Sequence, residues 1–434
     1  MKGLFPVLLR KVFARYRQTL QSIRSWLGLR LRIASCLVRQ RRILMRIRAK
    51  PQTEKIRVLF LNSEPSKWKC QSVYEDMDKS GLFEPMVGIT ALGLQSSYTD
   101  DQLEAFLKQS EQFFDSLGDN HARTVSSRPR LYEDLEIFSP DIVFFPEPWS
   151  QKWPQTTERI SHYALLGYVP YYVPTHIETE KHCLQETHRY LTWYFLPNKQ
   201  MEKAYRKETP FLSYSYRFVS TGHPALDFYQ IAAPSSAANE NNYVIYAPHF
   251  SVCFPTNALS TPISTFLTTG KAILEYAKSH REMKWLFKPH PKLRSYLSET
   301  AVWSKEDVDI YYNEWESIGD ASYDGNYQKY FLSARALITD CDSFLAEFAG
   351  SGKPVIHLVR TNFHRTYAPY LQPVVDAYYR VDGLDEMRSV FKMVLEEAKD
   401  PLQEKRLEAI KSSGLSGIYA ARNIVEFLRK ELRC

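Results

Sequence analysis

The chain of 434 residues lacks the sequence features that mark several common protein classes. Its six cysteines are scattered and none of them form a CxxC pair, which argues against a zinc site or a disulfide framework and fits a reducing compartment. It has no run of 18 apolar residues, so no transmembrane span is expected. It has no GxGxxG after the first predicted strand, no Walker motif and no internal repeat. No ligand cluster calls for a metal, and no cofactor is expected.

Acidic residues are absent from positions 1–50, which hold 14 lysines and arginines. Since the whole chain has 56 basic and 49 acidic side chains, the remainder is a net-acidic body. Apolar residues recur at three- and four-residue spacing from Phe5 to Leu27, with basic residues between them. Residues 1–50 therefore predict a basic amphipathic helical arm.

An apolar face beside a cationic face suits an anionic membrane surface, which is the partner we expect for the arm. Three alternatives stay open: a helix packed on the protein body, a nucleic-acid patch, or an Arg-rich transit peptide. No recognised nucleic-acid-binding motif accompanies the arm, so no nucleic-acid partner is expected. A signal peptide is not expected, because arginines interrupt every candidate apolar core in this region.

Length favours two domains, and strand-like apolar runs alternate with amphipathic segments in both halves of the body. We place a first Rossmann-like domain at 52–225 and a second at 240–434, with a polar linker at 232–242. In the first domain the predicted strands are Lys55–Asn62, Glu84–Thr90, Asp141–Phe145, Val169–Val173 and Leu191–Leu196. The predicted helices there are Ser72–Lys79, Leu103–Leu117, Thr156–Leu166 and Lys199–Lys207.

In the second domain the predicted strands are Tyr243–Ala247, Lys284–Phe287, Ala336–Ile338 and Val355–Val359. The predicted helices are Ile263–Ser279, Phe344–Ala349, Leu384–Ala398, Leu402–Ser412 and Ile418–Leu432, the last of which could cross back onto the first domain. This pattern predicts an α/β protein whose two Rossmann-like domains face each other across a cleft. It is the layout of a nucleotide-sugar-type transferase.

Polar side chains cluster where the predicted strands end, which is where ligands bind in such sheets. His176 follows the strand ending at Val173 and is placed to act as a base, unless it is only a hydrogen-bonded structural histidine. Lys288 and His290 follow another strand and suit a diphosphate, with a plain charged loop as the alternative. His182 and His188 lack a helical metal-ligand spacing and are expected to be structural or surface residues.

The stretch 335–360 reads as strand, polar turn, helix and strand. Backbone N–H groups at a helix start attract anions, and Asp342 or Ser343 at this turn can cap the helix or face a ligand. Both readings are open on this stretch alone.

These motifs together resemble the CDP-glycerol glycerophosphotransferase family of teichoic-acid polymerases and primases, most closely over 218–360. The segments that carry the resemblance are Thr221-Gly222-His223-Pro224, Tyr246-Ala247-Pro248, Lys288-Pro289-His290-Pro291, and the positions Thr339, Asp340, Ser343, Glu347, Phe348, Ala349 and Pro354. His176 aligns with the histidine of the family's T-W-H-G-T-P segment. The chain departs from the family pattern at Thr175, Ile177, His249, Cys341 and Asp342, which leaves the donor and the acceptor open.

The resemblance implies a GT-B-like fold and transfer of an alditol phosphate from a CDP-activated donor to a lipid-linked or polysaccharide acceptor, in teichoic-acid-like or capsule polymer synthesis. It implies catalytic roles for His176 as the base and for His290. The implied donor-binding residues are Lys288, His249, Thr339, Asp340, Asp342, Ser343 and Glu347, the last of them on the ribose hydroxyls. The arm would hold the enzyme on the inner face of a bacterial cytoplasmic membrane.

Two other classes remain. One is a GT-B glycosyltransferase that uses a UDP- or CMP-sugar for capsule or lipopolysaccharide. The other is a non-catalytic, membrane-bound scaffold that binds no nucleotide.

Overall fold

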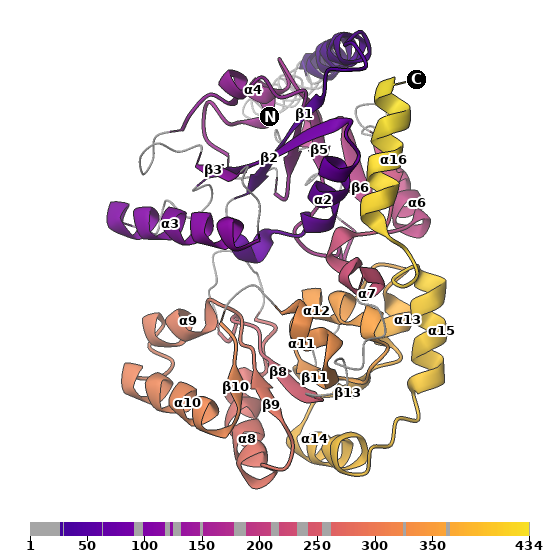
Figure 1. The fold of residues 1–434 in the computed structure, drawn as a ribbon. Helices are drawn as coiled ribbons and strands as arrows, with labels where there is room; N and C mark the ends of the chain where they lie inside the picture. Colours follow the sequence, from indigo (N-terminus) through magenta and orange to yellow (C-terminus); the bar gives the residue numbers. More distant parts are fainter. Residues whose placement is uncertain are drawn as a thin grey trace, which may run out of the picture.

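The computed structural model describes residues 27–433, except for 29, 63, 91–98, 118–121, 125–131, 148–150, 178–187, 210–216, 232–241, 254–261, 324–326 and 362–364. Within these residues the chain folds around two parallel sheets, which Figure 1 shows one above the other.

The first sheet has seven strands in the order β3-β2-β1-β4-β5-β6-β7. Its strands are β1 Ile56–Asn62, β2 Phe83–Ile89, β3 Ala122–Thr124, β4 Ile142–Phe145, β5 Leu165–Tyr168, β6 Trp193–Leu196 and β7 Arg217–Ser220. Its neighbouring strands pair in parallel; β1, for example, pairs Val58 with Pro85 on one side and with Ile142 on the other. The strands β4, β5 and β6 are wholly buried apolar runs, as expected for strands covered on both faces.

Helices on both faces of this sheet complete the first domain: α2 Gln71–Lys79, α3 Asp100–Ser116, α4 Thr157–Ile160, α6 Lys199–Glu208 and α7 Phe228–Ile231. The longest, α3, begins at a capping box in which Thr99 and Gln102 satisfy each other's backbone N–H groups. It buries Leu103, Leu107 and Phe114 against the sheet.

The second sheet has six strands in the order β10-β9-β8-β11-β12-β13. Its strands are β8 Tyr243–Ala247, β9 Trp285–Phe287, β10 Asp320–Ala321, β11 Ala334–Thr339, β12 Val355–Leu358 and β13 Tyr379–Val381. Its helices are α8 Phe266–Ser279, α9 Leu293–Glu299, α10 Lys305–Ile318, α11 Gln328–Leu332, α12 Asp342–Glu347, α13 Gln372–Val375, α14 Leu384–Phe391, extended by a π-turn at Lys392–Glu396, and α15 Gln403–Ser413.

Both sheets follow the doubly wound strand order, in which the direction of winding reverses at β1/β4 and at β8/β11. Such switch points open a crevice at the carboxyl ends of the strands. A continuous cluster of buried side chains joins the two domains, running from Leu59 and Tyr168 to Leu337 and Tyr370. The predicted α/β architecture of two Rossmann-like domains is confirmed.

The C-terminal helix α16, Ala420–Arg433, returns to the first domain, where Figure 1 shows it running beside α2. It buries Ile424 and Leu428 in the same cluster as Val73 and Phe195. Asp227, ahead of α7, accepts hydrogen bonds from the first backbone N–H groups of α16, Ala420 (2.7 Å) and Ala421 (2.9 Å).

The second half of the arm is also docked on the first domain. Residues 30–48 are helical and bury Cys36, Ile43 and Ile47. Gln40 donates hydrogen bonds from its amide to the carbonyls of Tyr190 and Leu191 (both 3.1 Å). Packing on the body therefore accounts for one face of this helix. Residues 1–26 of the predicted arm lie outside the described residues.

The opposite face of the same helix is exposed. It carries Leu31, Val38 and Met45, of which Leu31 keeps 71% of its surface, beside Arg41 and Arg42. No helix among the described residues combines the length and the apolar character that a membrane span requires.

Two predicted elements around β5 are wrong. The expected strand Val169–Val173 is irregular, because Pro170 has no N–H to donate to a strand ladder, and the strand lies earlier, at Leu165–Tyr168. The expected helix Thr156–Leu166 is only the single turn of α4, since its apolar end belongs to β5.

The turn after β7 contains a buried histidine that makes stability depend on pH. The Nε2–H of His223 donates to the Pro170 carbonyl (2.9 Å), and its Nδ1 accepts from the Ala225 N–H (3.2 Å). Burial lowers the pKa of His223 to about 3. Between about pH 6.5 and pH 3, His223 therefore binds a proton in the unfolded chain but not in the native protein.

We expect the free energy of unfolding to fall by about 1.4 kcal/mol per pH unit from this group as the pH drops from 6 to 5. His223→Gln should remove that share of the slope. The carboxyls of Asp227 and Asp340, whose pKa burial raises to about 6, act in the opposite direction but are common to both proteins. Urea unfolding at pH 7, 6 and 5 measures the difference; parallel pH curves for the two proteins would show that His223 is not the group responsible.

Candidate active site

The switch point of the second sheet is held together by Asp340, directly after β11. Its Oδ1 accepts from the His249 N–H (2.6 Å), and its Oδ2 accepts from the Thr265 N–H (2.7 Å) and the Ser264 hydroxyl (2.9 Å). Asp340 thus joins the end of β8, the start of α8 and the end of β11. Beside it, the buried Thr339 donates its hydroxyl to the Ala247 carbonyl (2.7 Å). Both side chains position the strand ends that carry the site; their roles as donor ligands stay predictions.

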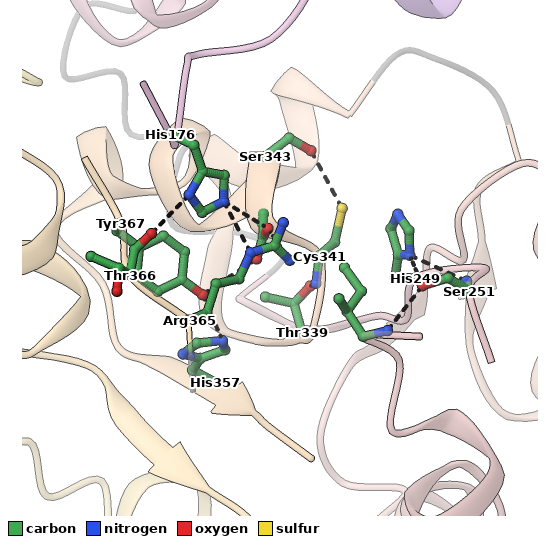
Figure 2. A network of polar contacts seen from close by, with 12 residues as sticks. His176, His249, Ser251, Thr339, Cys341, Ser343, His357, Arg365, Thr366 and Tyr367 are labelled. Carbon is green, nitrogen blue, oxygen red and sulfur yellow. Dashed lines mark hydrogen bonds and ion pairs between the residues drawn. The ribbon is translucent and has the colours of Figure 1, made fainter. Parts of the chain in front are cut away.

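A group of four side chains, His176, Asp342, Arg365 and Tyr367, lies at the turn after β11; we call it the His176 cluster. The ring Nδ1–H of His176 donates to the Thr366 carbonyl (2.9 Å), and its Nε2 accepts from the Arg365 Nε–H (3.0 Å). Asp342 forms an ion pair with Arg365 and lies 3.3 Å from His176 Nε2. Figure 2 shows the imidazole of His176 between Thr366 and Arg365.

This geometry fixes the protonation pattern of His176. A carbonyl only accepts hydrogen bonds, so Nδ1 carries the proton and the lone pair lies on Nε2. Burial alone would raise the pKa of Asp342, but its close contact with His176 and the charge of Arg365 outweigh burial and lower the pKa. Asp342 is therefore ionised and placed to stabilise an imidazolium at His176. The extra carboxylate that departs from the family pattern is balanced by Arg365.

The His176 cluster joins the two domains. The Thr175 carbonyl accepts from the Ala368 N–H (2.8 Å), and the Tyr370 hydroxyl donates to the Pro174 carbonyl. The rings of His176 and Tyr367 stack with centroids 5.4 Å apart. His176 therefore reaches the edge of the second sheet as predicted, although it follows an irregular segment rather than a strand.

A second group of polar side chains consists of His249 and His290, whose ring centroids are 5.2 Å apart; we call them the paired imidazoles. In each ring Nδ1 accepts the backbone N–H two residues further on, from Ser251 (3.2 Å) and Lys292 (3.1 Å). Each ring therefore carries its proton on Nε2. Burial lowers the pKa of His249 to about 4 and that of His290 well below its usual value.

The paired imidazoles are thus neutral at neutral pH, so the Nε2–H of His290 can offer a ligand a hydrogen bond but not a charge. Two lysines place positive charge near His290 and lower its pKa further, Lys292 and the buried Lys288. His249 and His290 follow the neighbouring strands β8 and β9. Their positions after strand ends predicted that they would lie on the same side of the sheet, and their rings are in contact. Figure 2 shows His249 and the His176 cluster on either side of Cys341.

The start of α12 differs from the prediction. Neither Asp342 nor Ser343 caps the helix; Cys341 is the N-cap residue, with no side-chain cap hydrogen bond. The Ser343 hydroxyl instead contacts the Cys341 thiol (3.3 Å). The Asp342 carboxylate contacts Arg365 and Tyr367 instead. Ser343 stays a predicted donor ligand.

Glu347, predicted on the ribose hydroxyls, is buried and engaged with protein groups. Its carboxylate accepts from the Tyr327 hydroxyl, which in turn accepts from Lys69 Nζ (3.0 Å). Burial lowers the pKa of Lys69 and raises that of Glu347, while their mutual attraction opposes both shifts. Since Lys69 belongs to the first domain, this relay links the domains. A role for Glu347 on the donor stays a prediction.

A cavity of about 270 Å³ opens beside the His176 cluster. Its walls come from the ends of β11, β12 and β13 and from α13, and include Asp342, His357, Arg365, Gln372 and Arg380. Burial lowers the pKa of His357 to about 4, so its imidazole is neutral. The cavity has the mixture of apolar walls and a few polar groups that is typical of small-molecule sites.

Sequence reasoning missed Arg365, Thr366 and Tyr367. They lie several residues beyond the end of β12, so a position directly after a strand does not mark them in the sequence. Of the other histidines, His188 is fully buried against Tyr168 and His182 lies outside the described residues. Across the described ranges, no group of three or more His, Cys, Asp or Glu side chains is placed to hold a metal ion.

No protein-family model matches the chain, and no curated protein sequence matches it either. Solved structures do match over most of its length. The wall teichoic acid polymerase TagF, as a variant soaked with CDPG, superposes with a TM-score of 0.56 at 13% identity, covering 93% of this chain and 96% of that one. The UDP-GlcNAc 2-epimerase of Neisseria meningitidis, bound to UDP-GlcNAc, gives 0.53 at 15% identity, covering 87% and 100%.

At such low identities these likenesses establish the fold alone. Together with the strand order of the two sheets, they confirm the expected GT-B-like arrangement.

Proposed function

We propose that the protein is a transferase that moves an alditol phosphate from a CDP-activated donor to a lipid-linked or polysaccharide hydroxyl, in the synthesis of a teichoic-acid-like or capsule polymer. The observation that supports it most directly is the pairing of a base with an anion site. His176 with its carboxylate partner lies on one side of the Cys341 turn, and His249, whose ring neighbours that of His290, lies on the other.

In the proposed reaction His176 Nε2 removes the proton of the acceptor hydroxyl. The acceptor oxygen attacks the β-phosphorus of the donor, and the bond from that phosphorus to the bridging oxygen breaks. CMP leaves with the bridging oxygen, and the alditol phosphate ends on the acceptor. The proton remains on His176, where Asp342 stabilises the imidazolium.

Transfer of this kind builds negative charge on the diphosphate oxygens, so preorganised donors are the main requirement. The proposed donors come from two adjacent strand ends. They are the Nε2–H groups of His249 and His290 and the ammonium group of Lys288. Because both imidazoles are held by backbone N–H groups, they need little reorganisation when a phosphate binds.

The acceptor side of the proposal includes the membrane. The exposed face of helix 30–48 combines Leu31, Val38 and Met45 with arginines, which suits an anionic lipid surface. We propose that this face and residues 1–26 bring the enzyme to a lipid-linked acceptor on the inner leaflet of a bacterial membrane.

The second candidate is a glycosyltransferase or related enzyme acting on a UDP-sugar, which the likeness to an epimerase bound to UDP-GlcNAc keeps open. Release of CMP from CDP-glycerol and CDP-ribitol, measured with a lipid-linked acceptor, tests the first proposal. We expect CMP release that falls at least about 100-fold in His290→Ala, the loss typical of a missing oxyanion donor. His280→Ala, which changes the residue at the C-terminal end of α8, the end away from Asp340, should leave it unchanged. Consumption of a UDP-sugar instead of a CDP-alditol would favour the second candidate.

A further inference from the structure

The lone pair of the proposed base is already occupied. Because Nδ1–H of His176 donates to the Thr366 carbonyl, the only acceptor on the ring is Nε2. That atom accepts from the Arg365 Nε–H at 3.0 Å. An imidazole held this way cannot also take a proton from an acceptor hydroxyl. In the arrangement seen here, Arg365 masks the base.

Arg365 is also the group best placed to leave. Its side chain is 25% exposed and lines the cavity beside the His176 cluster. Among the described residues its other polar partner is the carboxylate of Asp342. A donor diphosphate can present two oxygens to the N–H groups of a guanidinium, and it carries more negative charge than one carboxylate. It therefore competes strongly with Asp342 for Arg365.

Once Arg365 leaves, the atoms that remain form a working base. His176 keeps the hydrogen bond from Nδ1–H to Thr366, which holds the ring in place. Its Nε2 lone pair is freed, 3.3 Å from Asp342. The released carboxylate then stabilises the imidazolium formed when Nε2 takes a proton.

We propose that Arg365 exchanges partners when the donor binds, moving from His176 and Asp342 to the donor's phosphates and so unmasking the base. This inference rests on the proposed function and adds an order to it. The donor binds first, and the acceptor hydroxyl is deprotonated only afterwards. An empty site is thereby kept from acting on hydroxyls without a donor.

The test is the ¹⁵N resonance of His176 Nε2 in histidine-labelled protein, assigned by its loss in His176→Ala. Arg365→Ala should shift this resonance, since the hydrogen bond to Nε2 is gone. Adding CDP to the wild-type protein should move the resonance towards its position in Arg365→Ala. Adding CDP to Arg365→Ala should leave it nearly still. Arg360→Ala, which removes the same charge five residues earlier, should behave as wild type.

Affinity for CDP supplies the second readout. Arg365→Ala should weaken CDP binding by about 10–100-fold, and Arg365→Lys, which keeps the charge but not the fork, by less. A His176 resonance that stays fixed while CDP binds the wild-type protein would overturn the exchange and leave the proposed function standing. Failure of the wild-type protein to bind CDP would overturn both.

Discussion

His176→Ala is expected to lower turnover by about 10²–10⁴-fold, the usual contribution of a general base, with donor affinity within about three-fold of wild type. The physical reason is the separation of the two groups in the site. In the proposed reaction His176 acts on the acceptor hydroxyl, whereas the phosphates are expected at the paired imidazoles and Lys288. Removing the ring therefore takes away the proton acceptor without removing a phosphate ligand.

Steady-state turnover together with donor titration measures this split. His162→Ala serves as the matched control, since His162 is exposed on the first domain. Retention of more than about a tenth of the wild-type rate would exclude His176 as the base. A donor affinity that fell as far as the rate would instead mean that His176 binds phosphate.

The second large effect is expected in the relay of Lys69, Tyr327 and Glu347. Glu347→Ala should lower the free energy of unfolding by about 3–5 kcal/mol, because it leaves the buried Lys69 without a carboxylate. It also frees the hydroxyl of Tyr327. Urea unfolding at neutral pH measures the change, with the exposed Glu299→Ala expected within about 0.5 kcal/mol of wild type.

A double variant separates the lost charge pair from the lost packing. Lys69→Met combined with Glu347→Leu replaces the buried charges with apolar side chains and should recover much of the stability. If Glu347→Ala is as stable as wild type, the relay does not hold the domains together. In that case the carboxylate of Glu347 regains its place among the candidates for the donor's ribose.

The fold followed from the sequence where the apolar runs were long and bounded. Strands such as β1 and β8 were predicted to within a residue or two because apolar runs with polar ends mark buried parallel strands. The short edge strands β10 and β13 were missed, since two or three residues give no readable period. At β5 the apolar run continues through Pro170, but the strand ends before it. Proline has no backbone N–H for the strand ladder, and a hydrophobicity pattern does not show this.

Within the site, only the residues that directly follow predicted strands could be found from the sequence. His249, His290 and His176 were found because each follows an apolar run, and the structure brings them to the same edge. The partner of the base was not found, because Arg365 lies 189 residues away from His176 and only the packing of the two domains brings them together. The burial of Glu347 could not be foreseen either, since the sequence does not show that Lys69 would face it from the other domain.

Donor titration by calorimetry tests the central claim most directly. The full-length protein, with residues 1–50 intact, would be titrated with CDP-glycerol, CDP-ribitol, UDP-sugars and CMP-sialic acid. We expect that a CDP-alditol binds most tightly and that His290→Ala loses this binding. Preference for a sugar nucleotide would contradict the phosphotransferase and favour a glycosyltransferase, and binding of none of these nucleotides would leave a scaffold as the better description.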